Sequence, residues 1–160
     1  MWMNDAVERW LRSFQSWMDR RKRLGLARAA FKVLVADPHK PTRRLLEINF
    51  QRAGYPVVTT NDLHAVLPLL KSARPALVVL AIPADALKTE YQPIQEAIFS
   101  DPARPRTAIL LILDRNLTRD EMMIAFTFPS HVTLIAPYSP LEVLFFARRF
   151  LTDRFDHPSD

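Results

Sequence analysis

Five short apolar runs, rich in branched side chains, recur along this 160-residue chain with helix-like stretches between them. Strands of a parallel sheet read as near-continuous apolar runs, because helices cover both faces of such a sheet. The alternation therefore predicts an α/β protein built on one five-stranded, doubly wound parallel sheet. The expected strands cover residues 32–36, 56–60, 77–82, 108–113 and 132–135.

Capping and helix-breaking residues predict where the intervening helices begin and end. Gly54 suits the end of the first helix, and Thr118 with Glu121 has the spacing of a capping box at the start of the fourth. Pro140 suits the first turn of the fifth helix, whereas Pro93 inside the third predicts a late start or a kink. The expected helices cover residues 41–53, 63–72 and 87–100, and two more begin at residues 118 and 139.

The composition argues against several classes of enzyme. The chain has no cysteine, which removes disulfides, thiolate zinc sites and cysteine nucleophiles. Gly25 and Gly54 are its only glycines, so it has neither a glycine-rich phosphate loop nor a dinucleotide fingerprint. His64, His131 and His157 are scattered and lack an evident nucleophile partner. We therefore expect no enzyme activity and no cofactor.

Residues 1–24 read as an amphipathic helix in front of this fold, joined to it by a linker at 25–30. The apolar stripe of the helix has heptad spacing and consists of Met3, Val7, Trp10, Phe14 and Trp17. A basic collar follows, formed by Arg20, Arg21, Lys22 and Arg23. Three explanations stay open: the stripe packs on its own domain, contacts a second copy or another protein, or lies on an anionic membrane surface with the collar against lipid.

The net charge of +5 and the pI near 10.0 predict affinity for an acidic partner. Much of the excess lies in the collar, which is too short to read bases by itself, so the sequence argues against specific nucleic-acid binding. No run reaches the roughly 20 apolar residues that span a bilayer. Asp5 and Glu8 interrupt the region that would be apolar in a secretory signal. We expect a soluble protein.

Four segments resemble the receiver domains of bacterial response regulators, the chemotaxis-regulator-like family. Residues 32–37 and 42–55 are similar to the first strand and helix of that family, 74–81 to its third strand, and 136–142 to its fifth strand-to-helix turn. The resemblance covers residues 31–152 and leaves a polar tail at 153–160. It implies a flavodoxin-like sheet with strand order 2-1-3-4-5, in a cytoplasmic protein of bacterial two-component signalling.

The same resemblance implies that the phosphorylation site of the family is degenerate in this chain. The acidic pair that holds magnesium is reduced to Asp37 followed by Pro38, and Ala81 stands at the position of the phospho-accepting aspartate. The hydroxyl position falls on Ile112 and the lysine position on Ala136. Because the nucleophile, a metal ligand and the charge clamp are missing together, we expect neither phosphotransfer nor a bound metal.

A few polar residues near the expected pocket allow a different binding site. Asp37, His39 and Asp85 could meet there and hold another metal or a small ligand, but no ligand spacing supports this. We favour a family remnant at Asp37 and an exposed loop residue at His39. Asp114 is assigned ordinary turn chemistry and no role.

The expected fourth and fifth helices carry more apolar side chains than one buried face needs. These residues are Met122, Met123, Ile124, Phe126, Phe128, Leu141, Leu144, Phe145 and Phe146. Most of them are expected in the core, and the surplus makes Met123 and Phe145 candidates for a contact surface. The sequence thus predicts a phosphorylation-independent interaction module, an adaptor or assembly subunit that binds a protein partner or its own copy. The alternative is an adaptor held at a membrane by the N-terminal helix, and a DNA-associated regulator is less favoured.

Overall fold

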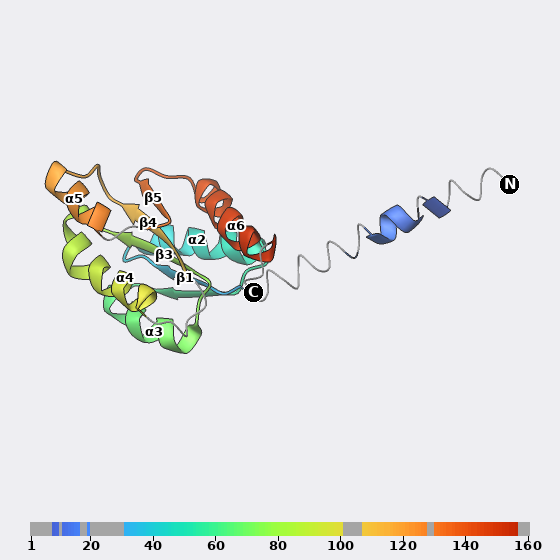
Figure 1. Cartoon of the computed structure of the whole chain (residues 1–160), viewed down its shortest axis with the longest axis horizontal. Coiled ribbons are helices and arrows are strands. Elements are labelled where there is room, and N and C mark those ends of the chain that lie inside the picture. Colours follow the sequence, from blue (N-terminus) through green and yellow to red (C-terminus); the bar gives the residue numbers. More distant parts are fainter. Residues whose placement is uncertain are drawn as a thin grey trace.

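The computed structural model describes residues 8–9, 11–16, 19, 31–100, 107–127 and 130–156, apart from the side chains of 126–127 and 152–156. At its centre lies one parallel sheet of five strands in the order β2-β1-β3-β4-β5 (Figure 1). The strands are β1 (Val33–Ala36), β2 (Val57–Thr60), β3 (Leu77–Ile82), β4 (Ala108–Leu113) and β5 (Val132–Ile135). The expected fold class and strand order are confirmed, and each strand lies within one residue of its expected limits.

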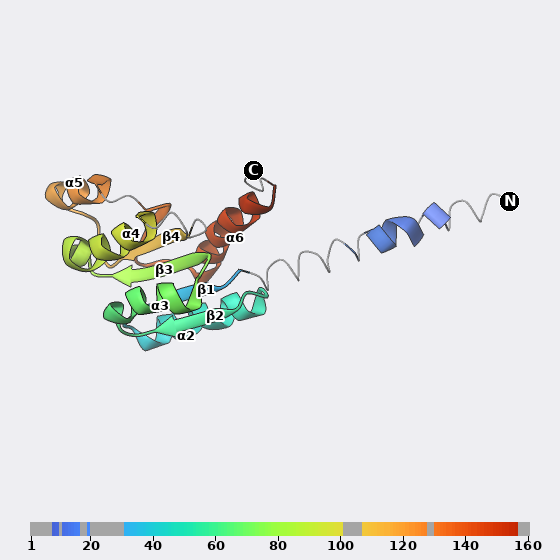
Figure 2. The same cartoon turned by 60° about the horizontal axis from the view of Figure 1, so that its bottom comes forward.

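Helices cover both faces of the sheet, which explains why the central strands are apolar on both sides. One face packs against α2 (Lys40–Arg52) and α6 (Pro140–Asp156), and Phe50 with Val143 belongs to the core there. The other face packs against α3 (Val66–Ala73), α4 (Gln92–Phe99) and α5 (Arg119–Thr127), with Leu70 and Ile94 in the core (Figure 2). Every residue of β1 and β4 is buried between these two layers.

The helix boundaries follow local capping chemistry. Gly54 has a φ of 93°, the left-handed conformation expected of a residue that ends a helix. The predicted capping box is confirmed, because the Glu121 amide donates to Thr118 Oγ1 at 3.3 Å and the Thr118 amide donates to Glu121 Oε2 at 3.4 Å. At α6, the Leu141 amide donates to Ser139 Oγ at 3.3 Å.

Three helices differ from the expected limits. The second begins as a 3₁₀ turn (Leu63–Ala65), where Asp62 accepts a hydrogen bond from the His64 amide, before α3 starts. The third begins as a π-helical turn (Leu87–Tyr91), and α4 follows with Pro93 in its first turn. Proline cannot donate to the carbonyl four residues before it, and the predicted irregularity at Pro93 takes this form. The last helix continues through Asp156, into the segment expected as a polar tail.

The described part of the N-terminal segment is helical at residues 11–16 and lies apart from the sheet and its helices in both views (Figures 1 and 2). Leu11 is 51% exposed and Phe14 is 45% exposed. These exposures give no support to packing of the stripe on its own domain. Most of the stripe and the whole collar lie outside the described residues: Met3, Val7, Trp10, Trp17, Arg20, Arg21, Lys22 and Arg23. Within the described part of the chain, no helix is long and apolar enough to cross a membrane.

Candidate functional site

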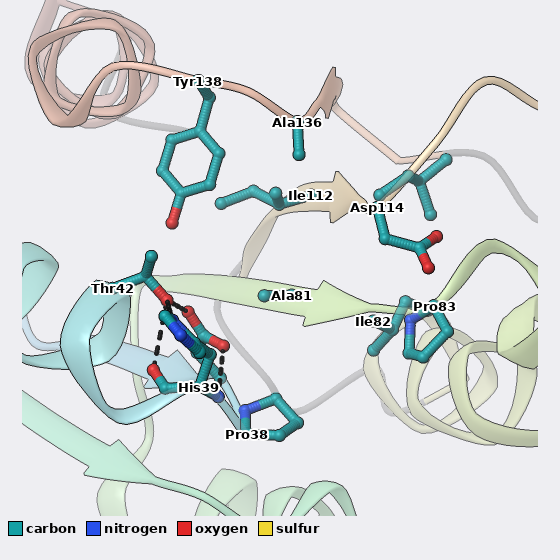
Figure 3. Close-up of a pocket in the computed structure, with 12 residues that line it drawn as sticks. Pro38, His39, Thr42, Ala81, Ile82, Pro83, Ile112, Asp114, Ala136 and Tyr138 are labelled. Carbon is teal, nitrogen blue, oxygen red and sulfur yellow. Dashed lines mark hydrogen bonds between the residues drawn. The ribbon is translucent and has the colours of Figure 1, made fainter.

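A pocket of about 300 Å³ lies where the carboxyl ends of β1, β3 and β4 meet the segment after β5 (Figure 3). This end of a parallel sheet is where doubly wound folds usually bind ligands. The pocket gathers all five positions of the predicted degenerate site: Asp37, Pro38, Ala81, Ile112 and Ala136. The remaining lining residues are His39, Thr42, Ile82, Pro83, Leu113, Asp114 and Tyr138.

Sheet register brings the apolar floor of the pocket together. Ala81 pairs with Ile112 across β3 and β4, so these two residues lie side by side although they are far apart in the sequence. Ile112 is 3% exposed, whereas Ala136, beyond the end of β5, is exposed at the rim. Figure 3 shows the three side chains around one space. An alanine methyl group can offer this space neither a nucleophile nor a charge.

Asp37 is buried, with 4% of its surface exposed, and it organises the turn from β1 into α2. Its Oδ1 accepts a hydrogen bond from the His39 amide at 2.9 Å, and its Oδ2 accepts one from the Thr42 hydroxyl. The Arg43 guanidinium donates to the main-chain carbonyl of Asp37 at 2.8 Å. Asp37 therefore has a structural role in this turn in addition to its place in the pocket wall.

His39 and Asp85 do not join Asp37 in a ligand set. The His39 side chain is exposed, and its Nδ1 lies 3.1 Å from the Thr42 hydroxyl oxygen. Asp85 is exposed in the short 3₁₀ helix η2 (Ala84–Ala86) and does not line the pocket. Among the described residues no three His, Cys, Asp or Glu side chains are grouped as metal ligands.

Asp114 has a role that the sequence analysis did not assign. Its Oδ1 accepts a hydrogen bond from the Ala84 amide at 2.8 Å, which joins the end of β4 to the turn after β3. Ala84 is 1% exposed, so this amide would otherwise be a buried donor without a partner. The two residues are 30 positions apart. The residues around Asp114 indicate a turn, but they carry no signal for a hydrogen bond to an amide 30 positions away.

Tyr138 is a second residue that the sequence analysis missed. Its side chain is half-buried, and its hydroxyl is buried without a hydrogen-bond partner among the described residues. In Figure 3 the hydroxyl points toward Thr42 across the pocket wall. Burial raises the pKa of Tyr138, the Asp37 carboxylate raises it further, and the nearby Thr42 hydroxyl partly offsets the rise. The phenol is therefore neutral at physiological pH.

The apolar surplus of the last two helices divides between core and surface. Leu144 is buried, and Ile124 and Phe146 pack partly buried against the two core clusters. Met123 is 66% exposed and Phe145 is 61% exposed. The exposed large apolar side chains of α5, the edge strand β5 and α6 are Met122, Met123, Ile135, Leu141 and Phe145. The side chains of Phe126 and Phe128 lie outside the described part.

The architecture defines the class of fold, which is that of CheY-like receiver domains. Three solved structures illustrate the likeness: the Vibrio cholerae chemotaxis protein CheY4 (20% identity, TM-score 0.61), the orphan response regulator HP1043 of H. pylori (18%, 0.64) and a receiver domain protein of Methanospirillum hungatei (12%, 0.65). They cover 75%, 78% and 79% of this chain, respectively, and 98% of their own chains. No family model and no curated protein matches the sequence. At these identities the likeness shows the fold alone.

Proposed function

We propose that this chain is a pseudo-receiver, a signalling module that works by binding a protein partner without being phosphorylated. The observation that carries the proposal is Ala81 on the floor of the pocket, beside Ile112 and opposite Ala136. Phosphoryl transfer to a receiver requires a carboxylate nucleophile and positive charge around the phosphoryl group. The three side chains at these positions provide neither.

A magnesium ion does not fit the donor groups of this pocket. Mg²⁺ requires hard oxygen ligands in octahedral geometry, supplied by carboxylates together with substrate phosphate or water. Asp37 is the only lining carboxylate at the end of β1, and the side chain of the next residue, Pro38, adds no ligand atom. The other lining carboxylate, Asp114, is engaged with the Ala84 amide. The pocket therefore supports no step that depends on magnesium.

Beryllofluoride with Mg²⁺, which mimics the phosphorylated state, tests phosphorylation independence. We expect no change in the thermal midpoint of the full chain and no shift of the Ala81 and Ala136 methyl resonances. The Ala81→Asp variant is the matched comparison, because it restores a carboxylate at the acceptor position alone. A rise of several degrees in the wild-type midpoint would contradict the proposal.

We place the partner surface on the exposed apolar side chains of α5, β5 and α6. Exposed apolar patches on soluble domains commonly mark contacts. Phe145→Glu should weaken self-association or partner capture while the far-UV spectrum and thermal midpoint stay close to wild type. Leu67→Glu, at a 37% exposed position on α3, is the matched control and should leave association unchanged. Equal loss in both variants, or unfolding of the Phe145 variant, would contradict this assignment.

A further inference from the structure

Asp37 is a buried carboxylate that has no cationic partner among the described residues. Its two hydrogen bonds come from neutral donors, an amide and a hydroxyl, and no charged side chain among the described residues forms an ion pair with it. The neighbouring Arg43 directs its guanidinium to the main-chain carbonyl oxygen instead. Buried carboxylates in proteins are normally paired with a cation as well as hydrogen-bonded. Because Asp37 also lines the pocket, a cation bound in the pocket would lie next to a carboxylate that has no ion pair with the described residues.

The Tyr138 hydroxyl lines the same pocket as Asp37 and points toward Thr42, whose own hydroxyl donates to Asp37 (Figure 3). It forms no hydrogen bond of good geometry among the described residues. Burial raises the pKa of the phenol, and the nearby Thr42 hydroxyl lowers it only slightly against that effect. A phenol oxygen can accept a hydrogen bond as well as donate one. A group that carries several N–H donors would satisfy Asp37 and Tyr138 together.

The rest of the pocket adds an apolar surface and more negative charge. Ala81, Ile112 and Ala136 provide the apolar wall, and Asp114 lies across the pocket from Tyr138 (Figure 3). Within the part of the chain that the structure describes, no Lys or Arg side chain lines the pocket, and the exposed His39 is the only lining side chain there that can carry a positive charge. Two carboxylates without a lining Lys or Arg disfavour an anion and favour a cation.

We propose that this pocket binds a primary ammonium group on a short apolar stem, either a free amine or a lysine side chain of a protein partner. The ammonium group donates hydrogen bonds to the Asp37 carboxylate and the Tyr138 oxygen. The stem packs against Ala81, Ile112 and Ala136. A site of about 300 Å³ accommodates a butyl chain, which matches the length of the lysine stem.

Methyl-resolved NMR on the full chain tests the proposal with three probes of similar shape: n-butylammonium, 1-butanol and butyrate. We expect saturable shifts of the Ala81, Ala136 and Ile112 methyl groups with n-butylammonium at pH 7. Affinity for 1-butanol should be at least about tenfold weaker, because it lacks the charge-assisted hydrogen bonds. Butyrate should produce no saturable shift. Equal binding of the amine and the alcohol, or no saturable shift with the amine, would overturn the proposal.

Variants inside and outside the pocket test whether n-butylammonium binds there. Asp37→Asn keeps one acceptor oxygen, for the His39 amide, and places an NH₂ donor near the Thr42 hydroxyl oxygen, which can accept from it. This variant should weaken the binding of n-butylammonium by about tenfold or more while leaving the binding of 1-butanol unchanged. Tyr138→Phe should weaken the affinity for n-butylammonium by about threefold to tenfold. Asp85→Asn removes an exposed carboxylate outside the pocket and should have no effect. Unchanged amine affinity in the Asp37 variant, with its methyl spectrum intact, would refute the role of that carboxylate.

The source of the ammonium group is distinguished by a fourth probe, N-acetyl-lysine N-methylamide. If the pocket admits a lysine side chain of a folded partner, this compound should shift the same methyl groups with an affinity close to that of n-butylammonium. A pocket that takes only free amines should bind n-butylammonium and exclude the lysine derivative. Either result supports ammonium binding, and binding of neither compound would overturn it.

Discussion

Removal of the Asp114 carboxylate tests whether a single long-range hydrogen bond holds the two halves of the pocket rim together. In the Asp114→Ala variant the Ala84 amide loses its acceptor at 2.8 Å and stays buried, because Ala84 is 1% exposed. A buried donor without a partner costs about 1–3 kcal/mol of stability. For a domain of this size the thermal midpoint should fall by roughly 4–12 °C.

Urea unfolding followed by far-UV circular dichroism measures this effect directly. A loss of about 2 kcal/mol should lower the midpoint by roughly 1 M if the slope is about 2 kcal/mol per M. Asp114→Asn keeps an acceptor oxygen and should recover much of the loss, and Asp85→Ala at an exposed site should stay within about 0.5 kcal/mol of wild type. If Asp114→Ala were as stable as Asp85→Ala, the assigned role of the carboxylate would be wrong.

Three further predictions concern the edges of the domain. His131→Ala should cost about 1–3 kcal/mol in urea unfolding, because His131 Nδ1 accepts from the buried Ile109 amide at 3.0 Å, and His131→Asn, which keeps an acceptor, should cost less. The hydrogen bond from Arg115 lowers the pKa of Glu121 below its ordinary value of 4.5. Wild type should therefore have a higher thermal midpoint than Glu121→Gln above pH 4.5, and this difference should vanish as the pH falls below 4.5. A difference that persists at about pH 2 would show that the Glu121 carboxylate is not its cause. Deletion of residues 1–24 should leave the thermal midpoint unchanged, and a loss of several degrees would instead indicate that the segment packs on its own domain.

The sequence predicted the strands and the starts of the first, fourth and fifth helices well because these depend on local chemistry. The limits of β3 and β4 agree with the apolar runs, since a strand covered on both faces has no polar residue to interrupt it. The start of α5 agrees with the capping-box spacing of Thr118 and Glu121. The end of α6 was placed too early, because the polar residues after 152 continue the helix instead of ending it.

The resemblance implied that Asp37, Pro38, Ala81, Ile112 and Ala136 lie at the same end of the sheet, and the structure brings these five residues around one pocket. The contacts of Asp114 and the surroundings of the Tyr138 hydroxyl could not be predicted from the sequence. Asp114 bonds to an amide 30 positions away, and the environment of the Tyr138 hydroxyl depends on how α2 and the segment after β5 meet. Contacts of this kind exist only after the layers have packed. The polar contacts of the pocket were therefore predicted incompletely.

The presence of Asp37 has a structural reason that is independent of any metal. Its carboxylate accepts from the His39 amide and the Thr42 hydroxyl, and its carbonyl accepts from Arg43, so the whole residue fixes the start of α2. The turn therefore needs Asp37 whether or not the pocket takes part in phosphoryl chemistry. The consequence is a negative charge that the turn requires, next to a space that no cation of the described chain occupies.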